Sequence, residues 1–331
     1  MSLLKKKPSP TAKPEIKYEN EYRKELCTQA ELAQDIIKEH IRGGKITFDK
    51  LHLDPKGIRT VYIVAQSGNS ALALWAEKAF ETVCCTFTKA LSTESFKQSL
   101  PPTDRHTLTI FIGKDIPQEA KECQGKTLLL TGSAAPKSHA LCTHYESTLQ
   151  VADFTLSYLL LSMLAVYIAR KKGLLTELYY KLVIEAFAEL RAALNNIMKN
   201  EQFLIRLSEE LKPDHLILTG RGEDYPCAVY ISRLFSTAYG NDIRAVNLEN
   251  IGDINDKSNL IALASSDRQY SLLPSLDYSF KIAPLGCDDS IKNLCYQGML
   301  PLFNPLLSCV TAQVIAYHII YGTKGEQKTE A

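Results

Sequence analysis

Two patterns of hydrophobic and polar residues alternate along the chain: short apolar runs rich in β-branched residues, and longer segments with apolar positions at helical spacing. The run at 60–65 reads TVYIVA and ends in the polar turn QSGNS at 66–70. Apolar residues then recur at helical spacing as far as Phe80. This order of strand, turn and helix is typical of a parallel α/β sheet.

The same order returns in the second half of the chain and indicates an internal repeat. The run at 216–219 (LILT) predicts a strand, residues 220–222 a turn, and residues 225–239 a helix. Further apolar runs predict strands in both halves, at 108–112, 127–130, 243–246, 259–264 and 279–283. Strands that alternate with helices favour parallel sheets covered by helices.

Longer segments predict three further helices: an amphipathic entry helix at 19–40, an apolar helix at 152–172 and a helix with one charged face at 176–211. The stretch 154–169 carries no charge, but a membrane span needs about 20 apolar residues. It also contains serine, threonine and tyrosine. We therefore expect a helix buried at a domain or subunit contact, with membrane spanning as the alternative.

The chain length suggests two domains. Residues 1–18 are rich in lysine and proline and have too few large apolar groups to offset the entropy of ordering, so we expect a disordered tail. The first domain, with the entry helix and the interdomain helices, is predicted at 19–200. The second domain is predicted at 201–331, with the junction near Asn200.

Charge and cysteine content narrow the classes of function. The 331 residues include 38 Lys and Arg against 37 Asp and Glu, and this net charge of +1 excludes a broad nucleic-acid-binding surface. The nine cysteines include no CxxC pair, so the sequence predicts neither a zinc site nor a disulfide framework. Since no apolar segment of signal-peptide length precedes the entry helix, we expect a cytoplasmic protein with reduced, mostly buried cysteines and no cofactor.

The first repeat turn is a candidate ligand site. In doubly wound sheets, ligands bind beyond the carboxyl ends of the strands, where backbone N–H groups can hold an anion. This turn offers hydroxyl and amide groups that suit a sugar or a phosphate, although the same residues also suit a plain connection between strand and helix. The candidate ligand-binding residues are Gln66, Ser67, Gly68, Asn69 and Ser70.

The second repeat turn, formed by Gly220, Arg221 and Gly222, resembles a phosphate cradle. Neither GxGxxG nor GxxxxGK[ST] occurs in the chain, so nucleotide binding has little support. Arg221 has two nearby carboxylates, Glu223 and Asp224, as alternative partners.

Two motifs stand out, GRGEDYP at residues 220–226 and PLLSCVTAQVIAYH at residues 305–318. They resemble the tandem sugar isomerase (SIS) domain family, specifically the isomerase half of the glucosamine-6-phosphate synthases. The first is similar to the family's GRGxxYP, and the second is similar to its C-terminal helix. The resemblance covers residues 45–325 in outline. It implies two SIS domains, each a five-stranded parallel sheet between layers of helices, in a homodimer. It also implies a phosphosugar ligand and isomerisation of ketose to aldose through an enediolate.

The chain departs from the family where the family binds phosphate and carries its catalytic groups. The family's SQSxET phosphate loop matches residues 113–118 (GKDIPQ), in which Lys114 offers a partly compensating cation. The family's glutamate base matches Thr237. The histidine that the family takes from the neighbouring subunit is also missing, because no histidine occurs between His215 and His318.

Few residues are left as candidate catalysts. Glu146 and Glu249 are weak candidates for a base, and Lys324 and Lys328 are weak substitutes for the tail lysine that reaches the sugar in the family. We therefore predict a diverged tandem-SIS protein that binds a sugar or sugar phosphate without the usual catalytic apparatus. One alternative is an active phosphosugar isomerase or deaminase with a rebuilt site, and another is a structural subunit. Neither a nucleic acid nor a membrane is predicted as a partner.

Overall fold

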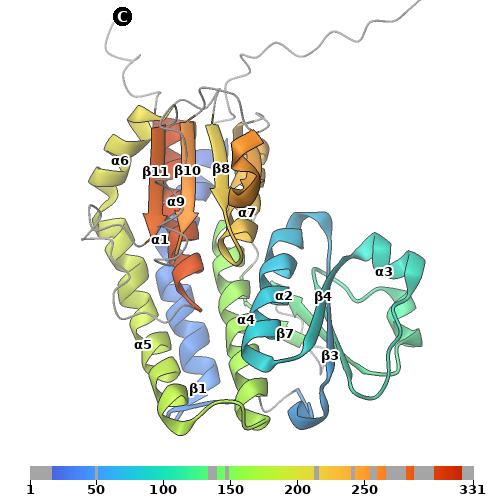
Figure 1. Cartoon of the computed structure of the whole chain (residues 1–331). Coiled ribbons are helices and arrows are strands. Elements are labelled where there is room, and N and C mark those ends of the chain that lie inside the picture. The colour runs from blue at the N-terminus through green and yellow to red at the C-terminus, as the bar shows by residue number, and fades with distance from the viewer. Residues whose placement is uncertain are drawn as a thin grey trace, which may run out of the picture.

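The computed structural model describes residues 17–48, 51–132, 140–145, 149–211, 216–239, 243–253, 259–265, 281–286 and 302–322. Two parallel sheets and the helices that cover them make up this part of the chain (Figure 1). Most of the predicted tail and three candidate site residues lie outside the described residues: Glu146, Lys324 and Lys328.

The first sheet has five parallel strands in the order β4-β3-β5-β6-β7. Their bounds are Thr60–Ala65 (β3), Phe87–Ser92 (β4), Thr107–Ile112 (β5), Lys126–Thr131 (β6) and Ala140–Cys142 (β7). The strands predicted at 60–65, 108–112 and 127–130 are confirmed. Every residue of β5 is buried, because both faces of a parallel sheet are covered. Helix α2 (Ser70–Cys84) follows β3, and α3 (Thr93–Ser99) follows β4.

The second sheet has four parallel strands within the described residues, in the order β11-β10-β8-β9. Their bounds are Leu216–Gly220 (β8), Arg244–Asn247 (β9), Asn259–Ala264 (β10) and Lys281–Gly286 (β11). Helix α7 (Asp224–Tyr239) follows β8 as predicted. The α/β class with parallel sheets flanked by helices is therefore confirmed.

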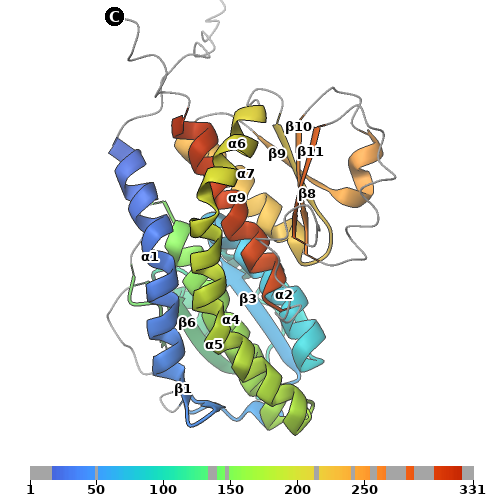
Figure 2. The ribbon, with the colours of Figure 1, turned by 90° about the vertical axis from the view of Figure 1, so that its left-hand side faces the viewer.

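A group of packed helices lies beside the sheets, as Figure 2 shows. It contains α1 (Lys17–His40), α4 (Val151–Lys171), α5 (Glu177–Lys199), α6 (Glu201–Glu210) and α9 (Asn304–Tyr321). A short hairpin, β1 (Ile41–Arg42) and β2 (Lys45–Ile46), follows α1. The helix predicted at 176–211 is two helices, because the chain turns at Asn200, whose side-chain amide donates to the carbonyl oxygen of Asn196 at 2.8 Å.

Helix α4 is the central helix of the fold. Among the described helices it alone has the length and apolar content of a membrane span, and 89% of its most apolar stretch is buried inside the protein. Two ring stacks fix its place: Tyr158 stacks on Trp75 of α2 with centroids 3.5 Å apart, and Phe154 stacks on Tyr230 of α7 at 3.9 Å. The helix is thus buried between the two halves of one chain.

The cysteines differ from expectation. All seven described cysteines are free thiols, but only Cys84, Cys227 and Cys309 are buried. Cys85 is exposed and ends α2 in the left-handed conformation, with φ of 49°. Burial raises the pKa of the Cys84 thiol to about 12. The expectation of mostly buried cysteines is therefore wrong for the described residues.

Candidate functional site

Two loops that carry predicted site residues meet at the carboxyl edge of the first sheet. The turn 66–70 follows β3, and the loop that begins at Gly113 follows β5. A Cβ atom at Gly113 would lie 3.5 Å from Cδ of Gln66, so the two loops are in contact. The N–H of Gly113 donates to the carbonyl oxygen of Leu130 in β6 at 3.0 Å, which fixes the loop, and Lys114 follows as an exposed residue.

The start of α4 lies against the same edge. Gln150 precedes α4 in the left-handed conformation, and its side-chain amide lies 3.4 Å from the position of a Cβ atom at Gly68. After β7, the N–H of Thr143 donates to the carbonyl oxygen of Thr131, and its hydroxyl donates to Oδ1 of Asp153 at 3.3 Å. The ends of β3, β6 and β7 therefore all meet the first turn of α4.

Asp153 is a candidate site residue that sequence reasoning missed. Burial raises the pKa of its carboxyl to about 6; the hydrogen bond from Thr143 opposes this rise, and the nearby charge of Glu25 adds to it. A carboxyl with a pKa of about 6 near the candidate ligand edge suits proton transfer. The sequence marks Asp153 only as the last charge before the apolar run of α4.

Behind Asp153, a carboxylate from α1 holds the start of α4. Oε2 of Glu25 accepts the backbone N–H groups of Val151 at 2.9 Å and Ala152 at 3.1 Å. Glu25 is only 3% exposed. A negative charge at a helix N-terminus is favourable because it satisfies N–H groups that have no partner within the helix and opposes the positive end of the helix dipole.

The second half of the chain reaches this edge through α7. Nη1 of Arg233 donates to the backbone carbonyl oxygen of Ser67 in the first turn. One helical turn earlier, the hydroxyl of Tyr230 donates to the carbonyl oxygen of Gln150 at 3.0 Å. These contacts place α7 against both the first turn and the start of α4. Sequence reasoning missed Arg233, although it shares a helix face with the apolar Tyr230.

Another set of predicted residues lies at the carboxyl edge of the second sheet. A Cβ atom at Gly220 would lie 2.7 Å from the carbonyl carbon of Asp224, so glycine is needed for α7 to begin this close to β8. Nε of Arg221 forms an ion pair with Oε1 of Glu249 at 2.8 Å. The Asp224 carboxylate accepts the backbone N–H and the hydroxyl of Ser265 at 3.0 and 2.9 Å. Arg221 and Glu249, both predicted site residues, therefore pair with each other.

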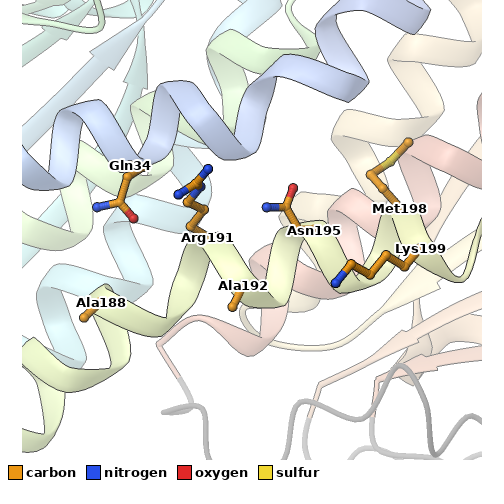
Figure 3. A pocket seen from close by; sticks show the side chains of 7 residues that line it. All are labelled: Gln34, Ala188, Arg191, Ala192, Asn195, Met198 and Lys199. Carbon is orange, nitrogen blue, oxygen red and sulfur yellow. The ribbon is translucent and has the colours of Figure 1, made fainter.

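An open groove lies elsewhere, between α1 and α5 (Figure 3). Arg191, on one wall, forms an ion pair with Glu31 of α1 at 2.6 Å. The lining residues are Gln34, Ala188, Arg191, Ala192, Asn195, Met198 and Lys199. None of them follows a strand of either sheet, so the groove is separate from the candidate site.

The fold matches solved structures closely. The C-terminal domain of glucosamine-fructose-6-phosphate aminotransferase from Francisella tularensis superposes with a TM-score of 0.80, covering 90% of this chain and 95% of that chain at 17% identity. The chain has the tandem SIS fold. Glucosamine-6-phosphate deaminase from Thermotoga maritima shares this fold, with a TM-score of 0.68 over 92% of the SIS chain described here and 95% of its own, at 15% identity.

Comparison of the amino-acid sequence with known proteins gives a more limited result. No protein-family model matches it. The isomerizing glutamine–fructose-6-phosphate aminotransferase of Zymomonas mobilis is 28% identical over 222 residues, which are 60% of this chain and 37% of that protein. The SIS chain thus spans little more than a third of that relative. The predicted resemblance to tandem SIS proteins is confirmed at the level of the fold.

Proposed function

We propose that this SIS protein binds a phosphosugar, or a related anionic sugar derivative, at the carboxyl edge of the first sheet. The observation that carries the proposal is the convergence of the turn 66–70, the loop of Lys114 and the guanidinium of Arg233. Hydroxyl and amide groups of the turn suit sugar hydroxyls, and cations suit a phosphate. The similar proteins named above carry the names of fructose-6-phosphate and glucosamine-6-phosphate enzymes, which supports this class of ligand.

The proposed role is binding without the family's usual catalysis. The residue that matches the family's glutamate base is Thr237, which lies exposed on α7. Glu249 is engaged with Arg221 at the second sheet. The second candidate function is an isomerase or deaminase with a rebuilt site, and Asp153 is the observation that favours it, because a carboxyl with a pKa of about 6 can exchange a proton at neutral pH.

Calorimetric titration with fructose-6-phosphate, glucosamine-6-phosphate, their unphosphorylated sugars and inorganic phosphate tests this function. We expect one phosphosugar to bind more tightly than its parent sugar and to raise Tm. Incubation of the bound phosphosugar in D2O, followed by NMR, separates the two candidates, since an enediolate takes up deuterium at the carbon next to the carbonyl. Deuterium uptake would establish an enzyme, and failure of every ligand to bind would overturn both candidates.

We further propose that the protein is a cytoplasmic homodimer. Leu178, 70% exposed, and its neighbours Tyr179 and Leu182 form an apolar patch at the start of α5 that suits burial against a second copy. The free state of the described cysteines supports a reducing compartment. We also propose that the junction between the two domains lies near Asn200, between α5 and α6. Light scattering at micromolar concentration should give twice the chain mass, and a monomer mass would overturn the dimer.

A further inference from the structure

Arg233 is a cation placed across the boundary between the two halves of the chain. It belongs to α7 of the second half, yet its guanidinium hydrogen-bonds the carbonyl oxygen of Ser67 in the first. A guanidinium has five N–H donors, so this carbonyl leaves further donors available. Within the described part of the chain, Arg233 forms no ion pair with a carboxylate, so its charge is not compensated there.

The turn that Arg233 contacts is free of acidic groups. Residues Ser67–Asn69 form a 3-10 turn that leads directly into α2, and the first turn of α2 contains no acidic residue. Neither Gln66 nor Asn69, the residues that precede these two segments, caps them with its side chain. Within the turn, the N–H of Asn69 donates to the carbonyl oxygen of Gln66 at 2.8 Å, and the N–H of Ser70 donates to that of Ser67, the carbonyl that Arg233 also contacts. The guanidinium therefore lies at the residues that lead into α2, whose N-terminus is the positive end of the helix dipole.

The start of α2 differs from the starts of α4 and α7 in the charges beside it. The start of α4 is held by the carboxylate of Glu25. The start of α7 contains Asp224, which is itself bonded to Ser265. Both starts already have a carboxylate of the chain itself, whereas the start of α2 has a guanidinium and no carboxylate among its first residues. An anion from solution is therefore best accommodated at the start of α2.

We propose that Arg233 anchors the phosphate group of the ligand at the turn between β3 and α2. In the SIS family, a loop rich in serine and threonine binds the phosphate. Residues 113–118 after β5 contain neither, and Arg233 supplies the phosphate contact in their place. This inference rests on the proposed function and names the residue on which selectivity for the phosphate depends. Because the guanidinium and the turn come from different halves of the chain, the bound phosphate bridges the two SIS domains. Lys114, exposed on the neighbouring loop, adds a second positive charge.

The test compares wild type with Arg233→Gln and Arg233→Lys, using glucosamine-6-phosphate, glucosamine and inorganic phosphate as calorimetric probes. Arg206→Gln is the matched control, because Arg206 is an exposed arginine of α6, away from both sheet edges. Arg233→Gln should weaken glucosamine-6-phosphate binding about tenfold or more and leave glucosamine binding unchanged. Arg233→Lys should lie between, since lysine keeps the charge without the planar fork. Arg206→Gln should bind all probes as wild type does.

The outcomes separate this inference from the function on which it rests. If wild type binds glucosamine-6-phosphate and Arg233→Gln binds it equally tightly, the anchor is overturned and the binding function stands. If Arg233→Gln loses affinity for glucosamine and its phosphate in equal proportion, Arg233 shapes the turn and the anchor is again overturned. If wild type binds none of the probes, the function fails and the anchor with it. Should Arg233→Gln have a lowered Tm, the Arg233→Lys variant decides by the same ratio of affinities.

Discussion

The carboxylate of Glu25 accepts the backbone N–H of Val151 at 2.9 Å, across 126 residues of sequence. Gln150, the residue before α4, supplies no side-chain cap, so the cap comes from a different helix. The entry helix α1 therefore contributes to the candidate ligand edge of the first sheet as well as to the core. The buried carboxylate of Glu25 fixes where α4 begins, and with it the positions of Gln150 and Asp153.

Replacement of Glu25 by alanine should lower the free energy of unfolding by about 2–3 kcal/mol. The buried N–H groups of Val151 and Ala152 would lose a charged acceptor. Urea unfolding followed by circular dichroism measures the loss. Glu31→Ala on the same helix is the control, because Glu31 pairs with Arg191 at the surface and should cost less than about 1 kcal/mol. Equal losses in the two variants would contradict the capping role.

Asp153 should make the stability of the protein depend on pH. Its folded pKa of about 6 lies above the ordinary value of 3.8, so the fold prefers the neutral carboxyl. The contribution of this group is therefore fully present below a pH of about 4 and is lost as the pH rises through about 6. Asp153→Asn stays neutral at every pH. Its stability relative to wild type should therefore rise by up to about 2–3 kcal/mol as the pH increases from about 4 to neutral. Urea unfolding across this range measures the difference, and a constant difference would rule the idea out.

Replacement of Gly220 by alanine should disrupt the start of α7. The added Cβ atom would lie 2.7 and 2.8 Å from the carbonyl carbon and oxygen of Asp224, and backbone atoms cannot move aside as a flexible side chain does. We expect a loss of about 2–3 kcal/mol in thermal unfolding. Gly322→Ala serves as the comparison, because its Cβ atom would meet the nearest atom, in His318, at an ordinary 3.8 Å. A loss as large in Gly322→Ala would argue against the close contact as the cause.

Gln313, the glutamine of the C-terminal motif, connects three helices of the core. Its side-chain amide donates to the carbonyl oxygen of Val151 and to the hydroxyl of Tyr230, both at 3.2 Å. Gln313→Leu should cost about 1–3 kcal/mol, because these buried acceptors lose their donor. Combined with Tyr230→Phe, the loss should be smaller than the sum of the two single losses, since the two residues share a hydrogen bond. Strict additivity in urea unfolding would show that the bond contributes nothing.

Much of the sheet structure could be predicted because its central strands are buried on both faces. Strands β3, β5 and β10 consist mainly of apolar residues, and their expected bounds differ from the observed ones by at most one residue. The edge strand β4 reads FTKALS and was not predicted, because half of its residues are polar and they follow no strict alternation. The break at Asn200 was also missed, since the helical pattern continues through it on both sides.

Only part of the candidate site could be predicted from the sequence. The turn 66–70 and the loop at Lys114 could be located, because the end of a strand in a parallel sheet marks the ligand edge. Arg233 and Asp153 could not be found, because their part in the site depends on which way α7 and α4 face after packing. The role of Glu25 could not be predicted either, because in the sequence it is one of many charged residues on an amphipathic helix.

The first and last described helices of the chain are direct neighbours. The hydroxyl of Tyr22 donates to the carbonyl oxygen of Gln313 at 2.8 Å, and the rings of Tyr22 and Tyr321 lie 6.1 Å apart. Lys17, where α1 begins, and Tyr321, where α9 ends, are thus close enough for a short peptide linker to join them. A circularly permuted chain, opened at the exposed turn between α4 and α5, would then retain both sheets and place the entry helix in mid-sequence.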